Sequence, residues 1–170
     1  MSKGLSSKPV VLTGPYLGES QMTLPPFDPV QVFGDDFSVF CQDKRSEALL
    51  TLNTTAMVCD DASKRGIVGE TSIKRKLERI KSYGFIPLDA RFAKAFITTG
   101  RGNKNLWDMV LEEHRFAARV IIFGGTILRE RNGDLWVVQV ERRGGWLKLS
   151  ASNLEDVVGA EVAFAITRGA

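Results

Sequence analysis

Residues 105–141 constrain the fold more than any other part of the chain. Asn132-Gly133 separates two apolar, β-rich segments, and this dipeptide favours a type I′ hairpin turn because both of its residues accept positive φ angles. Gly124-Gly125 lies earlier in the same stretch and predicts a break between two strands. Asn105 is a suitable N-cap for a helix with one apolar face, and this helix would come before the strands. The stretch therefore predicts a helix followed by antiparallel strands.

The length of 170 residues is sufficient for one domain with a sizeable core. We expect residues 1–29 to form a flexible, extended N-terminal arm, because its prolines fix φ and remove hydrogen-bond donors. Residues 30–170 are expected to form a single α+β core domain. In that domain a mostly antiparallel sheet would pack against two helices.

The second of these helices is expected between a cap at Thr71 or Ser72 and a stop at Gly84, with Ile73, Leu77 and Ile80 as its buried stripe. Local patterns predict further elements along the chain. They are a β-leaning segment at 30–40 with a turn at 34–36, strands at 50–58 and 91–99, a short helix at 153–158 and a half-buried strand at 161–167.

Charge and hydropathy bound the class of protein. The formal net charge is +3 and the sequence pI is about 9.0, a mildly basic balance that is compatible with a phosphate or anionic-lipid partner. No apolar run approaches the roughly 18–20 residues of a spanning helix. We therefore expect a soluble or peripheral protein made in the cytosol, with Cys41 and Cys59 as buried free thiols.

The sequence contains no recognisable catalytic motif. His114 is the only histidine, so a two-histidine zinc motif cannot form, and neither a nucleophile elbow nor a dinucleotide fingerprint is present. We therefore expect no catalytic residue, no metal site and no cofactor. The enzyme hypothesis that remains places a metal ion among Asp35, Asp36, Glu112 and His114.

The helix expected at 71–84 carries one acid, Glu78, against several cations. Such an excess is either a solvated helix face or a surface that binds phosphates, acidic protein or anionic lipid. The candidate residues, which include two cations that precede the helix, are Lys64, Arg65, Lys74, Arg75, Lys76, Arg79 and Lys81.

A second candidate surface lies at the end of the arm, in the sequence Leu24-Pro25-Pro26-Phe27. One interpretation is a lead-in that lies on the protein's own surface. The other is a self-association peptide whose Leu24 and Phe27 insert into another subunit.

The central stretch resembles the matrix proteins of rhabdoviruses, in particular those of the plant-infecting cytorhabdovirus branch. In that family a Trp-Asp helix start precedes a Phe-Gly strand, a charged strand, a glycine turn and a Trp-Val strand. The matching residues here are Trp107-Asp108, Phe123-Gly124 and Trp136-Val137. The resemblance covers residues 106–140. The arm departs from the family because it carries only Lys3 and Lys8, and because Leu24-Pro25-Pro26-Phe27 lies where relatives have a Pro-Pro-x-Tyr budding motif but lacks the tyrosine.

The resemblance implies a non-enzymatic structural protein that self-associates, condenses the helical nucleocapsid and links it to the envelope during virion assembly and budding. The implied partners are further copies of the chain, the viral nucleoprotein–RNA complex, an anionic membrane and the viral glycoprotein. The implied location is the virion and the membranes of the host cytoplasm, with the nucleus as a further site. The alternative hypothesis is a small basic nucleic-acid-binding or host-modulating protein of a phage or virus.

Overall fold

The protein has an α+β fold, as the sequence predicts. The computed structural model describes residues 22–49, 51–52, 58–60, 71–100, 119–159 and 162–168. The helices are α1 (Pro29–Phe33), α2 (Lys44–Glu47), α3 (Ile73–Ser82) and α4 (Ala90–Gly100). The strands are β1 (Met22–Thr23), β2 (Phe37–Gln42), β3 (Thr51–Leu52), β4 (Val58–Asp60), β5 (Thr71–Ser72), β6 (Phe85–Pro87), β7 (Val120–Glu130), β8 (Leu135–Arg143), β9 (Trp146–Asn153), β10 (Val157–Val158) and β11 (Val162–Arg168).

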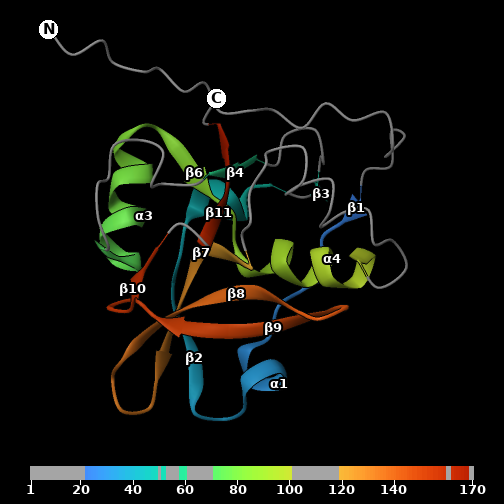
Figure 1. Ribbon diagram of the computed structural model, residues 1–170. Helices are drawn as coiled ribbons and strands as arrows, with labels where there is room; N and C mark the ends of the chain where they lie inside the picture. Colours follow the sequence, from blue (N-terminus) through green and yellow to red (C-terminus); the bar gives the residue numbers. More distant parts are fainter. Residues whose placement is uncertain are drawn as a thin grey trace, which may run out of the picture.

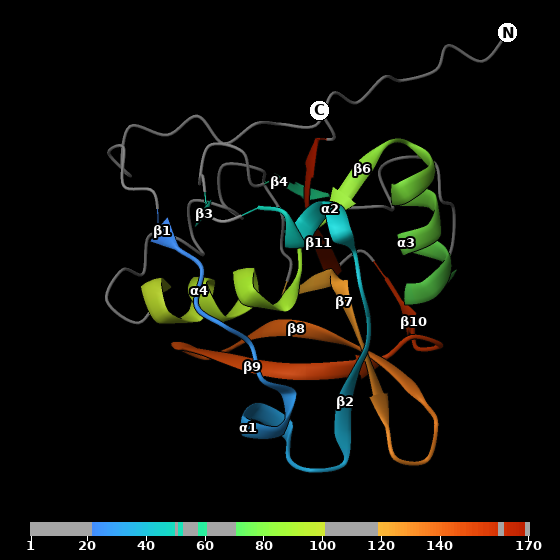
Figure 2. The same ribbon diagram turned by 180° about the vertical axis from the view of Figure 1, so that it is seen from behind.

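The main sheet is built around β7. Its strand order is β4-β11-β7-β8-β9, with β2 paired to β7 and β6 paired to β11. Every pairing is antiparallel except that of β11 with β7, which is parallel. Figure 2 shows β2 running from α1 toward α2, which lies next to β6.

Each face of the sheet is covered by one long helix, and Figure 1 shows α3 and α4 on opposite sides of β7 and β11. Successive residues of a strand point to opposite faces, so β7 contributes Ile121 and Phe123 to the core beside α4 and Ile122 to the core beside α3. β11 follows the same rule. Val162, Phe164 and Ile166 face α3 as one set, whereas Ala163 and Ala165 face α4. The strand expected at 161–167 is confirmed as β11, but the prediction that it is half-buried is wrong, because both faces of this central strand are buried.

Gly124-Gly125 does not break the strand. β7 continues through both glycines, and its register with β8 shifts between Phe123 and Ile127. At this point β7 changes neighbours from β11 to β2. The Gly125 amide donates to the Leu88 carbonyl at 2.9 Å, and the Asp43 amide donates to the Gly125 carbonyl at 2.7 Å. The glycines thus form an irregularity within one strand and permit close approach of the chain before α4.

The hairpin predicted at Asn132-Gly133 joins β7 to β8, although its turn differs from the expected type. The Gly133 amide donates to the Glu130 carbonyl at 2.8 Å, so Gly133 is the last residue of a four-residue turn rather than one of its two central residues. Gly133 has a φ of 96°, and a positive φ is what this last position of the hairpin turn requires. The Asn132 side chain accepts from the Asp134 amide at 2.9 Å and closes the loop.

Two segments expected as β structure are helical. Residues 91–99 belong to α4, because the Asp89 carboxylate accepts from the Arg91 amide as a cap and Phe92, Ala93 and Phe96 are buried at helical spacing. Residues 30–33 belong to α1, which follows from Asp28 as N-cap and Pro29 at the first helical position. The turn expected at 34–36 is present, with φ of 96° at Gly34.

The short helix expected at 153–158 is also wrong. Ser152 and Glu155 have the spacing of a capping box for that helix, but the Ser152 hydroxyl donates to the Gln139 side chain at 2.7 Å from within β9. Val157 and Val158 form β10, which pairs with β5 just before α3. The strand expected at 50–58 is described only at its two ends, as β3 and the start of β4. Cys41 is exposed on β2, so the prediction that it is buried is wrong.

Candidate interaction surfaces

Helix α3 is held firmly at its N-terminus. Ser72 caps it by accepting from the Arg75 amide at 3.3 Å. The amides of Ile73 and Lys74 donate to the carbonyls of Asp156 and Leu154, each at 3.0 Å, so the first turn is also tied to the loop after β9. The buried stripe of Ile73, Leu77 and Ile80 is as predicted. The opposite face is therefore presented to solvent in a fixed orientation.

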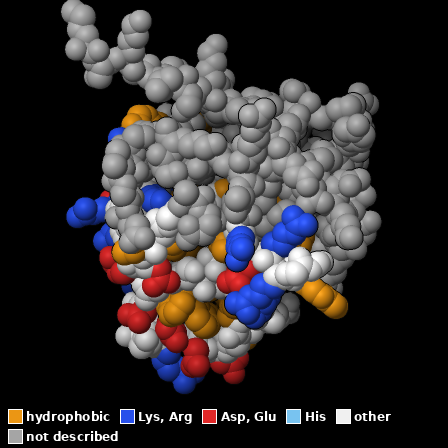
Figure 3. All heavy atoms as spheres, in the orientation of Figure 1, with side chains coloured by type: hydrophobic (Ala, Val, Ile, Leu, Met, Phe, Trp, Pro, Cys, Tyr) orange, Lys and Arg blue, Asp and Glu red, His pale blue; other side chains and the backbone are white. Residues whose placement is uncertain are grey.

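That solvent-facing side carries four cations, Lys74, Arg75, Arg79 and Lys81, and the helix contains one acid, Glu78. In Figure 3, Lys and Arg side chains project at the left edge of the molecule, where Figure 1 places α3. Lys74 lies 3.9 Å from Glu155 in an exposed ion pair, which contributes little to stability. Arg79 lies over the Tyr83 ring, with its Cζ 6.0 Å from the ring centroid. We call Lys74, Arg75, Arg79 and Lys81 the α3 cationic face.

Lys76 does not belong to this face, and its predicted exposure is wrong. Its side chain is 1% exposed, and Nζ donates to the Val158 carbonyl on β10 at 3.0 Å. The residue lies one turn from Ile73 and Ile80, on the side of the helix that faces the protein. The prediction took all the cations of the helix together and did not consider on which side of the helix each residue lies. Lys64 and Arg65 lie outside the described residues.

Helix α2 adds two exposed cations, Lys44 and Arg45, that the sequence analysis did not assign to a binding surface. Asp43 caps α2 and binds the Arg45 guanidinium through both carboxylate oxygens, at 3.1 and 2.8 Å. Burial alone would raise the pKa of Asp43, but hydrogen bonds from Arg45 and the charges of Arg45 and Lys81 together lower it. Figure 2 shows α2 beside β6, the strand that follows α3.

The Leu24-Pro25-Pro26-Phe27 segment lies along this chain's own core. Leu24 is 8% exposed and belongs to the core beside α4, and Phe27 packs against the same core. The Phe27 ring also lies 6.4 Å from that of Phe33 in α1. Lys94 on α4 donates to the Pro26 carbonyl at 2.9 Å. These contacts match the lead-in interpretation and occupy both side chains that the docking interpretation assigned to another subunit.

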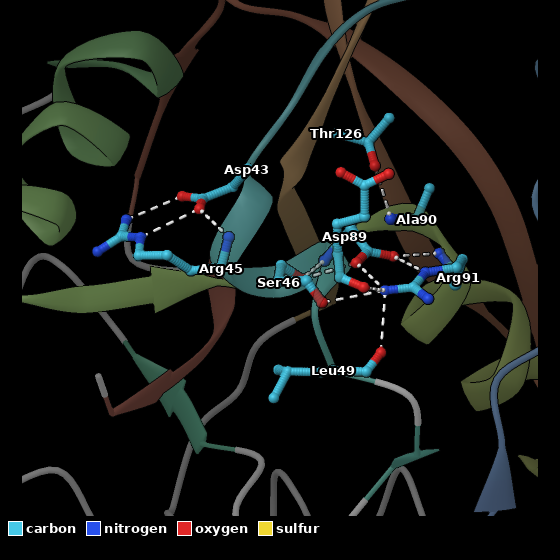
Figure 4. Close-up of polar contacts among 9 residues, drawn as sticks. Asp43, Arg45, Ser46, Leu49, Asp89, Ala90, Arg91 and Thr126 are labelled. Carbon is cyan, nitrogen blue, oxygen red and sulfur yellow. Dashed lines mark hydrogen bonds and ion pairs between the residues drawn. The ribbon is translucent and has the colours of Figure 1, made fainter. Parts of the chain in front are cut away.

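A buried polar junction joins α2 to the start of α4, and Figure 4 shows its side chains converging. The Ser46 hydroxyl donates to the Asp89 carboxylate at 2.7 Å and accepts from the Asp89 amide at 2.9 Å. Arg91 binds both Asp89 oxygens, at 3.0 and 2.8 Å, and donates to backbone carbonyls at the end of α2, including that of Leu49 at 3.1 Å. Thr126 on β7 accepts from the Ala90 amide at 3.0 Å.

This junction is suited to holding elements together. Ser46 and Asp89 are each 0% exposed, so the serine hydroxyl has no path to a substrate. The hydrogen bond to Asp89 raises the pKa of Arg91, which opposes the effect of burial and keeps the guanidinium charged. A satisfied, buried network of this kind fixes one arrangement of the elements that contribute to it.

The residues of the metal hypothesis are not brought together by the described part of the chain. Asp35 and Asp36 are exposed beside β2, and Asp36 forms an ion pair with Arg131 at 3.2 Å. Glu112 and His114, together with Asn105 and the helix expected there, lie outside the described residues. Among the described residues no three histidine, cysteine or acidic side chains cluster in a way that could hold a metal ion.

None of the helices in the described ranges has both the length and the apolar character needed to cross a bilayer. Comparisons of the chain with family models, with curated proteins and with solved structures found no match.

Proposed function

We propose that this chain is a non-enzymatic matrix protein that self-associates, binds and condenses a helical nucleocapsid and links it to a membrane during virion assembly. The observation that carries the proposal is the α3 cationic face, because its charges stand on a helix whose opposite side is buried and whose first turn is tied to the sheet. The resemblance of residues 106–140 to rhabdovirus matrix proteins supports the same function.

The α3 cationic face suits an extended acidic partner. Its cations recur over two turns of helix. A nucleocapsid presents acidic nucleoprotein surfaces and RNA phosphates as a repeating array. Several cations in fixed positions gain from such an array because each added contact releases counterions or pairs with a carboxylate.

Self-association is proposed to use the arm, with a boundary earlier than the sequence alone suggested. Leu24 and Phe27 fix the base of the arm to the core. A contact with a second copy would therefore be made by residues before Met22. If one copy binds a different surface of the next, the contact does not close on itself and propagates as a lattice or helix.

The binding surface is tested by charge reversal. We expect the variant Arg75→Glu with Arg79→Glu to lose at least about a hundredfold in affinity for polyglutamate or single-stranded RNA, since each lost phosphate or carboxylate contact is worth about 1 kcal/mol and each reversal adds repulsion. The variant Arg129→Glu with Arg131→Glu is the control, because it makes the same change in charge at exposed positions of β7 and its hairpin.

Circular dichroism establishes that both variants are folded, and titrations at low and moderate salt measure the affinities. Equal affinity of the α3 variant, the control and the unmodified chain would contradict the role of the α3 cationic face.

The second candidate function is a nucleic-acid-binding or host-modulating protein that uses the same helix. The observation that favours it is Tyr83, which is exposed at the end of α3 beside Arg79 and offers a ring on which a base can stack. This function predicts RNA affinity that falls steeply with salt, loss of affinity in Tyr83→Ala, and no self-assembly.

A further inference from the structure

The tip of the β8–β9 hairpin presents an aromatic side chain to solvent. Trp146 is 80% exposed, the most exposed large hydrophobic residue of the described chain. The turn before it is formed by Gly144, with φ of 59°, and Gly145. A Cβ atom at either glycine would meet no atom within 4 Å, so there is open space beside both glycines. The indole is thus the one large apolar side chain at this turn.

Two cations share the face of the hairpin that carries this indole. Trp146 pairs across the strands with Arg143, and Lys148 pairs with Glu141 on the same face of the hairpin. Arg142 pairs with Leu147 on the opposite face, and its amide donates to the carbonyl of Arg119, so two further exposed cations lie at this end of the sheet. Figure 3 shows hydrophobic atoms projecting on the right beside Lys and Arg side chains, where Figure 1 places this turn. Glu141 is the one carboxylate among them.

The base of the tip is rigid. The Glu141 carboxylate accepts from Gln139 at 2.8 Å, from Ser150 at 2.8 Å and from Arg143 Nε at 2.9 Å. Ser152 extends this row by donating to Gln139 at 2.7 Å. The row crosses between β8 and β9, so it holds the two strands in register and keeps Arg143 beside Trp146.

We propose that this hairpin tip is the element that contacts an anionic lipid surface, with the Trp146 indole in the interface and Arg143 and Lys148, on the same face of the hairpin, against the head groups. Tryptophan prefers the membrane interface because one side of its indole is apolar and its N–H can remain hydrated. Basic residues near an anionic leaflet add electrostatic attraction. The inference rests on the proposed function, for which it names the surface that faces the membrane.

The shape of the tip favours a membrane over a nucleic acid. Single-stranded nucleic acid binds in basic grooves that carry a series of aromatic side chains, one for each stacked base. Here one indole stands at the end of a narrow hairpin, with two glycines beside it that leave room for a flat surface. The α3 cationic face is on another element and remains available for the nucleocapsid.

The experiment is co-sedimentation of the full chain with vesicles of phosphatidylcholine, with and without about one third phosphatidylserine, so that the charged leaflet is the only variable. We expect binding to the charged vesicles only, and about tenfold weaker binding for Trp146→Ala, as for other exposed interfacial aromatics. Trp146→Tyr should restore part of the affinity. Phe40→Ala is the matched control, because Phe40 is a half-exposed aromatic with Arg129 at 4.0 Å, on β2.

Three results would overturn the proposal: no binding to charged vesicles, equal losses for Trp146→Ala and Phe40→Ala, or loss of RNA affinity in Trp146→Ala with vesicle binding unchanged. The proposed function fails separately, because it is tested by the α3 variant on polyglutamate and RNA. Trp146→Ala is expected to leave those affinities as they are.

Discussion

At the scale of single residues, two positions on the central strands carry requirements that composition does not reveal. Gly125 lies where β7 changes its neighbouring strand, and its backbone is hydrogen-bonded to the backbone of both Leu88 and Asp43. Glu141 accepts three side-chain hydrogen bonds near the end of β8. Gly125 is required because neighbouring backbone leaves no room for a side chain, and Glu141 is required because its negative charge accepts these hydrogen bonds.

Replacing Gly125 with alanine is expected to lower the free energy of unfolding by about 3 kcal/mol, because the added methyl overpacks a site where nothing can move aside. Its Cβ would lie 2.7 Å from the Asp89 amide nitrogen and 2.7 Å from the Leu88 carbonyl carbon, which are backbone atoms. Urea denaturation measures the change. Gly145→Ala is the control, and since its Cβ would meet nothing within 4 Å we expect a change of no more than about 0.5 kcal/mol. Similar values for the two variants would contradict this packing.

The Glu141 carboxylate makes stability dependent on pH. Burial alone would raise its pKa, but hydrogen bonds from Ser150, Gln139 and Arg143 together lower it below the ordinary value of 4.5. The ionised form therefore stabilises the fold above pH 4.5, and this contribution is lost as the pH falls from 4.5 through the lowered pKa.

We expect Glu141→Gln to cost about 1 kcal/mol at pH 7, as for the loss of charge-assisted hydrogen bonds, and to make the acid-induced fall in stability shallower. Thermal melts of both proteins between neutral and acid pH measure the effect. If the stability of the two proteins falls in parallel down to acid pH, the protonation of Glu141 is not coupled to folding.

At the scale of elements, the sequence predicts a helix or strand correctly where several local signals agree. It fails where the element is decided by contacts between residues far apart in the sequence. For α3 the cap at Ser72, the apolar stripe and Gly84 all point to the same helix. For α4 the residues Phe92, Phe96 and Ile97 also suit a strand, and the helix is decided by Asp89, whose partner Ser46 lies 43 positions away. Similarly, Ser152 has the position of a cap but is engaged by Gln139 of the neighbouring strand.

The candidate surfaces follow the same division. The charge of α3 is visible in the sequence, but the burial of Lys76 depends on β10, whose formation no local pattern indicated. Trp146 is prominent only because the strands pair so that it falls at the end of a hairpin.

The junction between α2 and α4 predicts a large effect for Asp89. Asp89→Ala removes the cap of α4 and leaves the partly buried Arg91 without its carboxylate, so we expect a loss of about 3–5 kcal/mol. Asp28→Ala, which removes the exposed cap of α1, should cost about 1 kcal/mol. Chemical denaturation compares the two. Equal losses would show that the junction adds nothing beyond capping.

At the scale of the whole molecule, the protein separates its surfaces around one sheet. The α3 cationic face lies on one side of β7 and β11, the base of the arm lies near α4 on the other side, and the hairpin tip stands at the end of β8 and β9 (Figures 1 and 2). Such a distribution suits a protein that joins a nucleocapsid, further copies of itself and a membrane. It predicts that a variant on one of these surfaces leaves the other two unchanged.

The most direct test of the matrix proposal is light scattering as a function of protein concentration and salt, on the full chain and on a chain that begins at Met22. The shorter chain keeps Leu24 and Phe27, which pack in the core beside α4. The proposal predicts that the full chain grows without a fixed endpoint and that the shorter chain stays monomeric. A full chain that is monomeric under every condition would contradict the matrix function and favour the nucleic-acid-binding or host-modulating one.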